Sequence, residues 1–187
     1  MGSINLNLRK LSFNSISAKV QPLFCIFKEI NEVDMKTPKR LEQALIKLYN
    51  AFHNNQLNPE CCSACAVGNI LDNHDSWKHL SDEHGSTELN YIGKVHQQLG
   101  RRFNGYTPLE LLQIEKIFLE ACGFIVPLCH YNPKPLNSTN KDMLFNGLCA
   151  VVDYLCELEG IYNVMDYSKI FEFENEYPVY QFDVIYQ

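Results

Sequence analysis

Two segments, 107–122 and 140–158, are apolar over most of a helical circumference, and they constrain the fold more than any other feature of the sequence. The first opens on a capping box that runs from Thr107 at the N-cap to Glu110 at the third helical position. Gly123 is suited to end this helix, because glycine readily adopts the left-handed conformation that follows a helix. A helix that is apolar nearly all round belongs in the centre of a protein. We therefore expect these two helices to form the core.

Apolar residues recur at helical spacing in other parts of the chain. A first helix is predicted from Thr37 at its N-cap to about residue 53, another over 88–99, and a short last one over 163–171. Their expected inward residues are Leu41, Leu45, Leu48 and Phe52 in the first helix, and Leu89, Ile92, Val95 and Leu99 in the second. The predicted fold class is all-α, an irregular compact bundle of about five to seven helices.

The predicted organisation has three parts: an N-terminal arm over 1–34, a single helical domain over 35–171 and an acidic C-terminal tail over 172–187. The arm reads as short alternating pieces and contains no acidic residue before Glu29. The tail contains acidic residues and no lysine or arginine. Alternating apolar residues mean that short strands could form in both extensions.

Composition excludes several classes of protein. The net charge of −6 and the pI near 5.5 argue against a nucleic-acid-binding protein. No apolar run approaches the roughly 18 residues that a membrane span needs. Eight cysteines could suggest a secreted disulfide scaffold. The chain is long enough to build a core without disulfides, however, and shows no convincing secretion signal, so we expect reduced thiols and a cytoplasmic location.

The strongest chemical signal is a cluster of cysteines followed by histidines. Cys61, Cys62 and Cys65 lie within five residues. On a helix over 60–72, with about 100° per residue, these thiols would point away from the apolar face. Together with a histidine they could bind zinc, which prefers four ligands in a tetrahedron, or an iron–sulfur cluster. The metal-ligand candidates are Cys61, Cys62, Cys65, His74, His79, His84 and His130.

Two other interpretations of these cysteines stay open. The thiols could be packed, reduced and inert, since their spacing fits no established metal-binding framework. Cys62 and Cys65 could instead form a redox-active dithiol. Such a dithiol is expected between a strand and a helix, and no such context is predicted nearby.

A second candidate surface is the basic, aromatic loop over 101–106. This loop could contact an anion or the acidic surface of a protein partner through Arg101, Arg102, Phe103 and Tyr106. The acidic tail could instead contact a basic surface of a partner. A solvated loop anchored by Phe103 is the simpler interpretation. No catalytic triad, pair of carboxylates or phosphate-binding loop stands out, so enzymatic activity and catalytic residues stay undefined.

The block 35–171, about three-quarters of the chain, resembles a small bacterial family. The resemblance rests on four short motifs: KLYNAFH from Lys47, CAVGNIL from Cys65, NGYTPLE from Asn104 and NVMDYS from Asn163. Members often carry the label of a component of the sodium-translocating NADH-quinone reductase. The label implies an oxidoreductase with a two-iron cluster, a flavin and NADH.

The motifs that this label requires are not present in the sequence. A plant-type two-iron site has the spacing C-x4-C-x2-C, whereas this chain has two adjacent cysteines and a third after two residues. No glycine-rich dinucleotide fingerprint follows a predicted strand, and no catalytic or flavin-binding residue is carried over. The leading hypothesis is a metal- or iron–sulfur-binding redox accessory protein. The alternatives are a metal-free protein-interaction module and an oxidoreductase component as the label implies.

Overall fold

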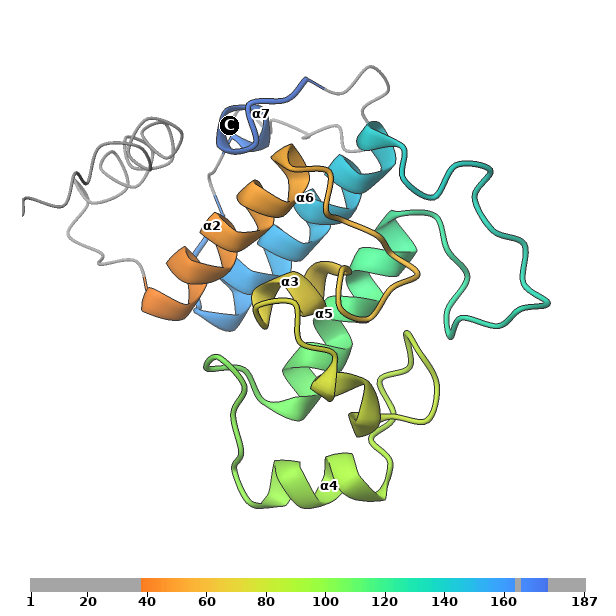
Figure 1. The fold of residues 1–187 in the computed structure, drawn as a ribbon. Helices are drawn as coiled ribbons and strands as arrows, with labels where there is room; N and C mark the ends of the chain where they lie inside the picture. Colours follow the sequence, from red (N-terminus) through yellow and green to blue (C-terminus); the bar gives the residue numbers. More distant parts are fainter. Residues whose placement is uncertain (1–37, 164–165, 175–187) are drawn as a thin grey trace, which may run out of the picture. The chain divides into compact units, whose positions relative to one another are not determined.

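The computed structural model describes residues 38–163 and 166–174 as a helical bundle (Figure 1). All of these residues belong to one compact unit, which begins at Thr37. The elements are α2 (Lys39–His53), α3 (Ala66–Ile70), the 3-10 helix η1 (Ser76–Leu80), α4 (Tyr91–Gln98), α5 (Pro108–Ala121), α6 (Lys141–Leu158) and α7 (Tyr167–Ile170). Within the described residues there is no strand, only an isolated bridge between Phe103 and Tyr106. The predicted all-α class is confirmed.

The core forms where α5, α6 and α2 pack together. Figure 1 shows α2 and α6 side by side, with α5 beneath them. The axes of α5 and α6 approach closely at Gly147, where an added Cβ would lie only 2.5 Å from the sulfur of Cys122. Leu111, Phe118 and Leu148 are fully buried along this contact. The prediction that 107–122 and 140–158 form the centre is therefore confirmed.

The capping box at the start of α5 has both of its hydrogen bonds. Thr107 Oγ1 accepts from the backbone N–H of Glu110 at 3.3 Å, and the backbone N–H of Thr107 donates to Glu110 Oε2 at 2.6 Å. The helix ends at Cys122, and Gly123 follows in the left-handed region with φ of 81°. Local sequence rules therefore predict both ends of this helix.

The helix expected over 60–72 is much shorter than predicted. Only Ala66–Ile70 is helical, with Cys65 as the N-cap. Residues 61–65 form a tight turn instead, in which the backbone N–H of Cys65 donates to the carbonyl oxygen of Cys61 at 2.7 Å. This turn folds back over Gly68, where an added Cβ would lie 2.5 Å from the carbonyl oxygen of Cys62. Cys61 and Cys62 are therefore not on a helix, and the predicted common thiol face does not exist.

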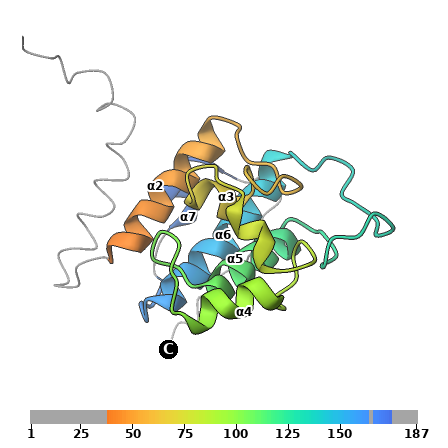
Figure 2. The same cartoon turned by 60° about the horizontal axis from the view of Figure 1, so that its bottom comes forward.

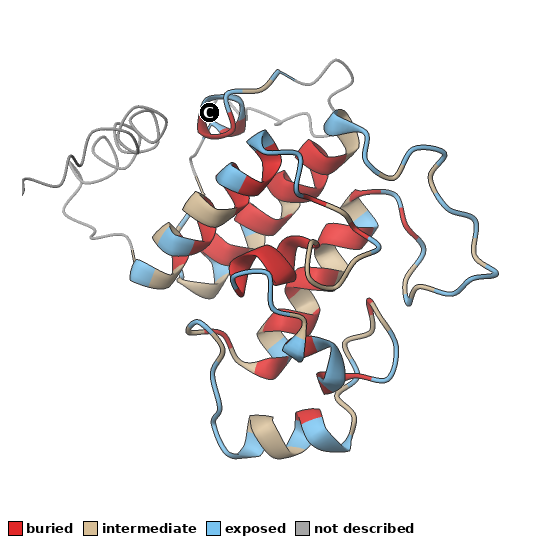
Figure 3. Ribbon diagram, viewed as in Figure 1, coloured by how far each residue is buried: buried red, intermediate tan, exposed pale blue. Residues whose placement is uncertain are grey.

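The orientation expected for the 88–99 helix is also wrong. In α4 only Gly93 is buried, whereas Ile92 is 49% exposed and Leu99, which follows the helix, is 77% exposed. The cause is a close backbone contact, because an added Cβ at Gly93 would lie 2.2 Å from the carbonyl oxygen of Leu80. The glycine therefore decides which side of α4 faces the bundle. In Figure 3 most of the α4 ribbon has the colours of exposed and intermediate residues.

The remaining predictions concern the ends of the chain. In α2, Pro38 occupies the N-cap position, and the predicted N-cap Thr37 lies outside the described residues. The N-terminal arm, the strand-like stretch of the C-terminal tail and most of that tail also lie outside them. The short last helix is α7. Among the described helices, none combines the length and the apolar character needed to cross a membrane.

Candidate metal centre

Three residues that are well separated in the sequence bring metal-ligating atoms together inside the bundle. The sulfur of Cys65, a ring nitrogen of His84 and a carboxylate oxygen of Glu115 all lie within 4.8 Å of one another. Cys65 precedes α3, His84 follows η1, and Glu115 lies in the middle of α5. Over residues 38–163 and 166–174, no other three His, Cys, Asp or Glu side chains come this close together.

The position of Cys65 follows from its role as N-cap of α3. Its sulfur accepts a hydrogen bond from the backbone N–H of Gly68 at 3.3 Å and lies 3.5 Å from the carbonyl oxygen of Cys62, to which the thiol donates. The residue is completely buried. The tight turn over 61–65 therefore points this sulfur inward, toward α5.

Glu115 is the least expected member of the cluster, because it is a completely buried carboxylate on an apolar helix. Its Oε1 lies 2.5 Å from Nε2 of His84. Its Oε2 is buried and accepts no hydrogen bond of normal geometry from the described residues, although, besides burial, hydrogen bonding between Glu115 and the Cys65 thiol contributes to the raised pKa of Cys65. Burying an oxygen of a carboxylate without a partner is unfavourable by about 1–3 kcal/mol or more. A bound ligand would explain an unsatisfied oxygen of this kind.

His84 connects the cluster to the surface. Its side chain is 19% exposed, whereas that of Glu115 is not exposed at all. The imidazole ring lies 5.7 Å from the ring of Trp77, which is buried. The backbone carbonyl of His84 accepts from the N–H of Leu128 at 2.7 Å, so the loop after α5 helps to hold this residue. An ion could therefore reach the cluster from the His84 side.

Burial and the Glu115 carboxylate together decide the protonation of the thiols. Burial, followed by the negative charge of Glu115, raises the pKa of Cys65 well above its usual value. The same two causes, in the same order, raise the pKa of Cys62. Without a cation, Cys65 is therefore a neutral thiol at neutral pH. A metal ion would have to displace its proton in order to bind the thiolate.

The three donors fit a zinc-type ion. Thiolate, imidazole and carboxylate are all zinc ligands, with distances of about 2.0–2.3 Å to the metal. In a tetrahedral site such ligand atoms lie about 3.3–3.7 Å apart. The three atoms lie within 4.8 Å of one another, and the 2.5 Å between His84 Nε2 and Glu115 Oε1 would have to lengthen for both to bind one ion. One thiolate and one carboxylate would also balance a divalent charge, which matters where the site is buried.

The other predicted ligands do not belong to this close group of ligand atoms. Cys61 is half-buried, and its sulfur lies 3.3 Å from the hydroxyl oxygen of Ser63. Cys62 is half-buried beside the cluster, and its carbonyl oxygen also accepts from Trp77 Nε1 at 2.9 Å. His74, His79 and His130 are exposed. The seven cysteines described are all free thiols: Cys61, Cys62, Cys65, Cys122, Cys129, Cys149 and Cys156.

Sequence reasoning missed Glu115, although a signal for it was present. The residue lies four positions after Leu111 and three before Phe118, and both are fully buried. A glutamate in the middle of an apolar stripe is rare unless it has a partner. Testing each helical stripe for a misplaced charge would therefore have identified it.

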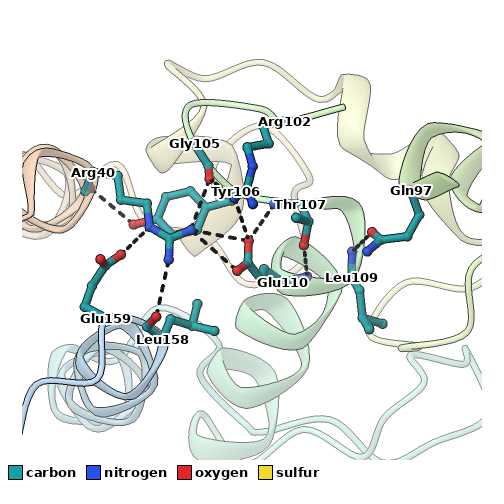
Figure 4. A network of polar contacts seen from close by, with 10 residues as sticks. All are labelled: Arg40, Gln97, Arg102, Gly105, Tyr106, Thr107, Leu109, Glu110, Leu158 and Glu159. Carbon is teal, nitrogen blue, oxygen red and sulfur yellow. Dashed lines mark hydrogen bonds and ion pairs between the residues drawn. The ribbon is translucent and has the colours of Figure 1, made fainter. Parts of the chain in front are cut away.

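A second polar network surrounds Arg40 and joins the ends of three helices (Figure 4). Arg40 forms ion pairs with Glu110, at 3.4 Å, and with Glu159. It also donates to the carbonyl oxygens of Gly105, at 3.1 Å, and Leu158, at 3.4 Å. Its guanidinium is therefore occupied by protein groups, and the network connects α2, α5 and α6 rather than forming a binding site.

The Arg40 network corrects one predicted partner contact. Tyr106 is only 1% exposed and lies beneath the guanidinium of Arg40, 5.0 Å from the ring centroid. Its hydroxyl donates to the carbonyl oxygen of Arg40 at 3.2 Å. Tyr106 is therefore a core residue and cannot contact a partner. Arg101 and Arg102 are exposed, and Phe103 is half-buried.

Comparison with known proteins adds no assignment to this geometry. No protein-family model matches the chain, and no curated protein or solved structure matches it either. The resemblance to proteins labelled as a component of the sodium-translocating NADH-quinone reductase stays a prediction.

Proposed function

We propose that this protein binds one divalent transition-metal ion, with zinc as the best fit, through Cys65, His84 and Glu115. The observation that carries the proposal is the buried, unpartnered Oε2 of Glu115 beside a thiol and an imidazole. A bound cation would satisfy this oxygen and neutralise the buried charge. The proposed role is that of a metal-dependent accessory protein.

The donor set supports a single ion rather than an iron–sulfur cluster. Iron–sulfur clusters are held mainly by several cysteine thiolates. Of the described cysteines, Cys65 alone belongs to the close group of ligand atoms. A fourth ligand could be water or the neighbouring thiol of Cys62, which is half-buried.

The ion would connect three segments that are far apart in the sequence. Cys65 precedes a helix of five residues, His84 lies in a loop and Glu115 belongs to the core helix α5. Binding free energy at such a site contributes directly to folding. The proposed function therefore includes ordering of residues 61–84 on α5 by the metal.

The direct test is metal binding by the chelator-treated protein. Wild type is titrated with Zn²⁺ in competition with a chromogenic chelator, and with Co²⁺ to observe the sulfur-to-metal charge-transfer absorption. We expect one ion per chain, and the charge-transfer absorption should be lost in Cys65→Ala. Glu115→Gln should weaken zinc binding by at least about 100-fold, more than the loss of an outer-shell partner does.

The matched control is Glu120→Gln, on the same helix but exposed and paired with Lys116. Its zinc affinity should equal that of wild type. Thermal unfolding of metal-free Glu115→Gln establishes whether that variant is folded. Absence of Zn²⁺ and Co²⁺ binding to wild type, or equal affinity in folded Glu115→Gln, would overturn the proposal.

The pH dependence gives an independent test. Because burial and the charge of Glu115 raise the pKa of Cys65, the metal must displace the thiol proton throughout the neutral range. Zinc affinity should therefore rise with pH, by about tenfold per unit for each proton released. An affinity for Zn²⁺ that does not change between about pH 6 and pH 8 would exclude Cys65 as a ligand.

A further inference from the structure

The amphipathic helix α4 turns its apolar side outward. Counting about 100° per residue, Tyr91, Val95, Leu99 and Ile92 fall within an arc of about 100°. Tyr91 is 82% exposed, Leu99 77% and Ile92 49%. Single exposed apolar residues are common on protein surfaces, but a cluster on one helical face indicates an interaction site.

This outward orientation is built into the bundle. The buried side of α4 contains Gly93, which lies against the backbone of Leu80. The side chain of Asn90 holds the same end of the helix, accepting from the Gly93 N–H at 3.0 Å and donating to the carbonyl oxygen of His79 at 3.1 Å. At the other end, Gln97 Oε1 accepts from the backbone N–H of Leu109 at 3.2 Å. The helix is therefore held at both ends, with its apolar side on the outside.

Figures 1 and 2 both show α4 at the edge of the bundle, beside α5. Among the described elements it packs mainly against η1 and α5. Gly93 of α4 lies against the backbone of Leu80 in η1.

The C-terminal end of this face is basic, whereas the whole chain has a net charge of −6. Residues 89–109 contain Lys94, Arg101 and Arg102 and no aspartate or glutamate. Two neighbouring carboxylates are already engaged, Glu110 by Arg102 at 4.0 Å and Asp82 by Asn90 at 3.0 Å. On the helical wheel Lys94 lies about 60° from Tyr91, on the same side of the apolar arc as Gln98. Beyond the C-terminal end, the exposed Arg101 lies over the ring of Phe103, 5.3 Å from its centroid. Apolar residues with a basic border complement apolar residues with acidic neighbours.

We propose that the outer face of α4, formed by Tyr91, Ile92, Val95 and Leu99 and bordered by Lys94, Arg101 and Arg102, docks an acidic amphipathic segment of a partner protein. The occupant places apolar side chains on the helix face and carboxylates near the two arginines. The proposal does not depend on the metal centre.

A protein segment fits this face better than a lipid surface does. The helix has eight residues, and is therefore about 12 Å long. Recognition of anionic membranes by basic clusters usually involves about four to eight lysines or arginines, and this face has three. Docking of a short apolar segment requires only a few well-placed anchors.

The test uses a synthetic helical peptide with apolar residues at helical spacing and flanking glutamates, titrated into the ¹⁵N-labelled full chain. We expect saturable chemical-shift changes centred on residues 91–102, and an affinity that falls with added salt. A peptide with lysines in place of the glutamates should bind at least about tenfold more weakly, because like charges then meet.

Variants of the outer face of α4 distinguish specific docking from non-specific peptide binding. The double variant Ile92→Gln and Leu99→Gln should weaken peptide binding by at least about tenfold and leave thermal stability unchanged, because both side chains are exposed. Arg101→Glu with Arg102→Glu should reverse the preference toward the lysine peptide. The matched control is Lys116→Glu, a charge change on α5.

Four results would overturn the proposal. They are no binding of the glutamate peptide, equal binding of the lysine peptide, binding only to anionic phosphatidylserine vesicles, and self-association of the full chain that Leu99→Gln abolishes. The last result would make α4 an interface between copies of this chain.

Discussion

Replacing Gly68 by alanine tests the close contact between α3 and the turn that carries the three clustered cysteines. An added Cβ would lie 2.4 Å from the carbonyl carbon of Ser63 and 2.5 Å from the carbonyl oxygen of Cys62. Both are backbone atoms, so a change of rotamer cannot relieve the clash. The turn would have to move away from α3, and Cys65 lies at the junction of the two.

The magnitude follows from two opposing effects. Alanine is favoured over glycine in a helix interior by about 1 kcal/mol. Overpacking of a tightly packed site costs about 1–3 kcal/mol, and contact with backbone belongs at the upper end of that range. We therefore expect Gly68→Ala to lower the free energy of unfolding by about 2 kcal/mol, or the melting temperature by about 4–8 °C.

The matched control is Gly147→Ala, another crowded glycine in a helix. Its added Cβ would lie 2.5 Å from the sulfur of Cys122 and 2.8 Å from the ring of Phe118. These neighbours are side chains and can shift, so this variant should lose less stability than Gly68→Ala. Adding Cys122→Ala to Gly147→Ala should remove part of the clash.

The free energy of unfolding of the three variants is measured by urea denaturation of the metal-free proteins. Their zinc affinity is measured by titration. Gly68→Ala should weaken zinc binding because the turn positions Cys65, whereas Gly147→Ala should not. If Gly68→Ala is as stable as wild type, or more stable, the described contact between the turn and α3 is wrong.

Three further predictions concern stability. Thr107→Ala removes the N-cap of α5 and should cost about 1 kcal/mol in urea denaturation; no loss would mean that the capping box is not formed. Arg40→Leu leaves two carboxylates without their common partner and should cost about 1–3 kcal/mol, a loss that high salt should not remove. Burial, followed by the charge of Asp153, raises the pKa of Cys149 and Cys156 to about 12. Because their folded pKa lies above the unfolded value, stability should be constant below about pH 8.5 and then fall toward pH 12, by at most about 1.4 kcal/mol per pH unit per thiol. Replacing both cysteines by alanine should make this alkaline slope less steep, and the other buried thiols and phenols account for what remains.

The candidate site was only partly accessible from the sequence. Cys65 and His84 were among seven predicted ligands, and their residue types alone made them candidates. The prediction that Cys61, Cys62 and Cys65 share one face depended on a helix over 60–72, of which the structure keeps only Ala66–Ile70. Glu115 was not predicted, because a glutamate on a helix is ordinarily exposed and only tertiary packing buries it.

The helical class, the capping box of α5 and the central position of α5 and α6 could all be predicted from the sequence. These features depend on residues within a few positions of one another, through hydrogen bonds at helix ends and the side on which apolar residues recur. Tertiary structure alone decided that Cys65, His84 and Glu115 meet, and that α4 turns its apolar side outward. Both results depend on contacts between separate segments of the chain. At α4, Gly93 allows a close backbone contact with Leu80, and this contact rather than the helix's amphipathic pattern decides which side faces the bundle.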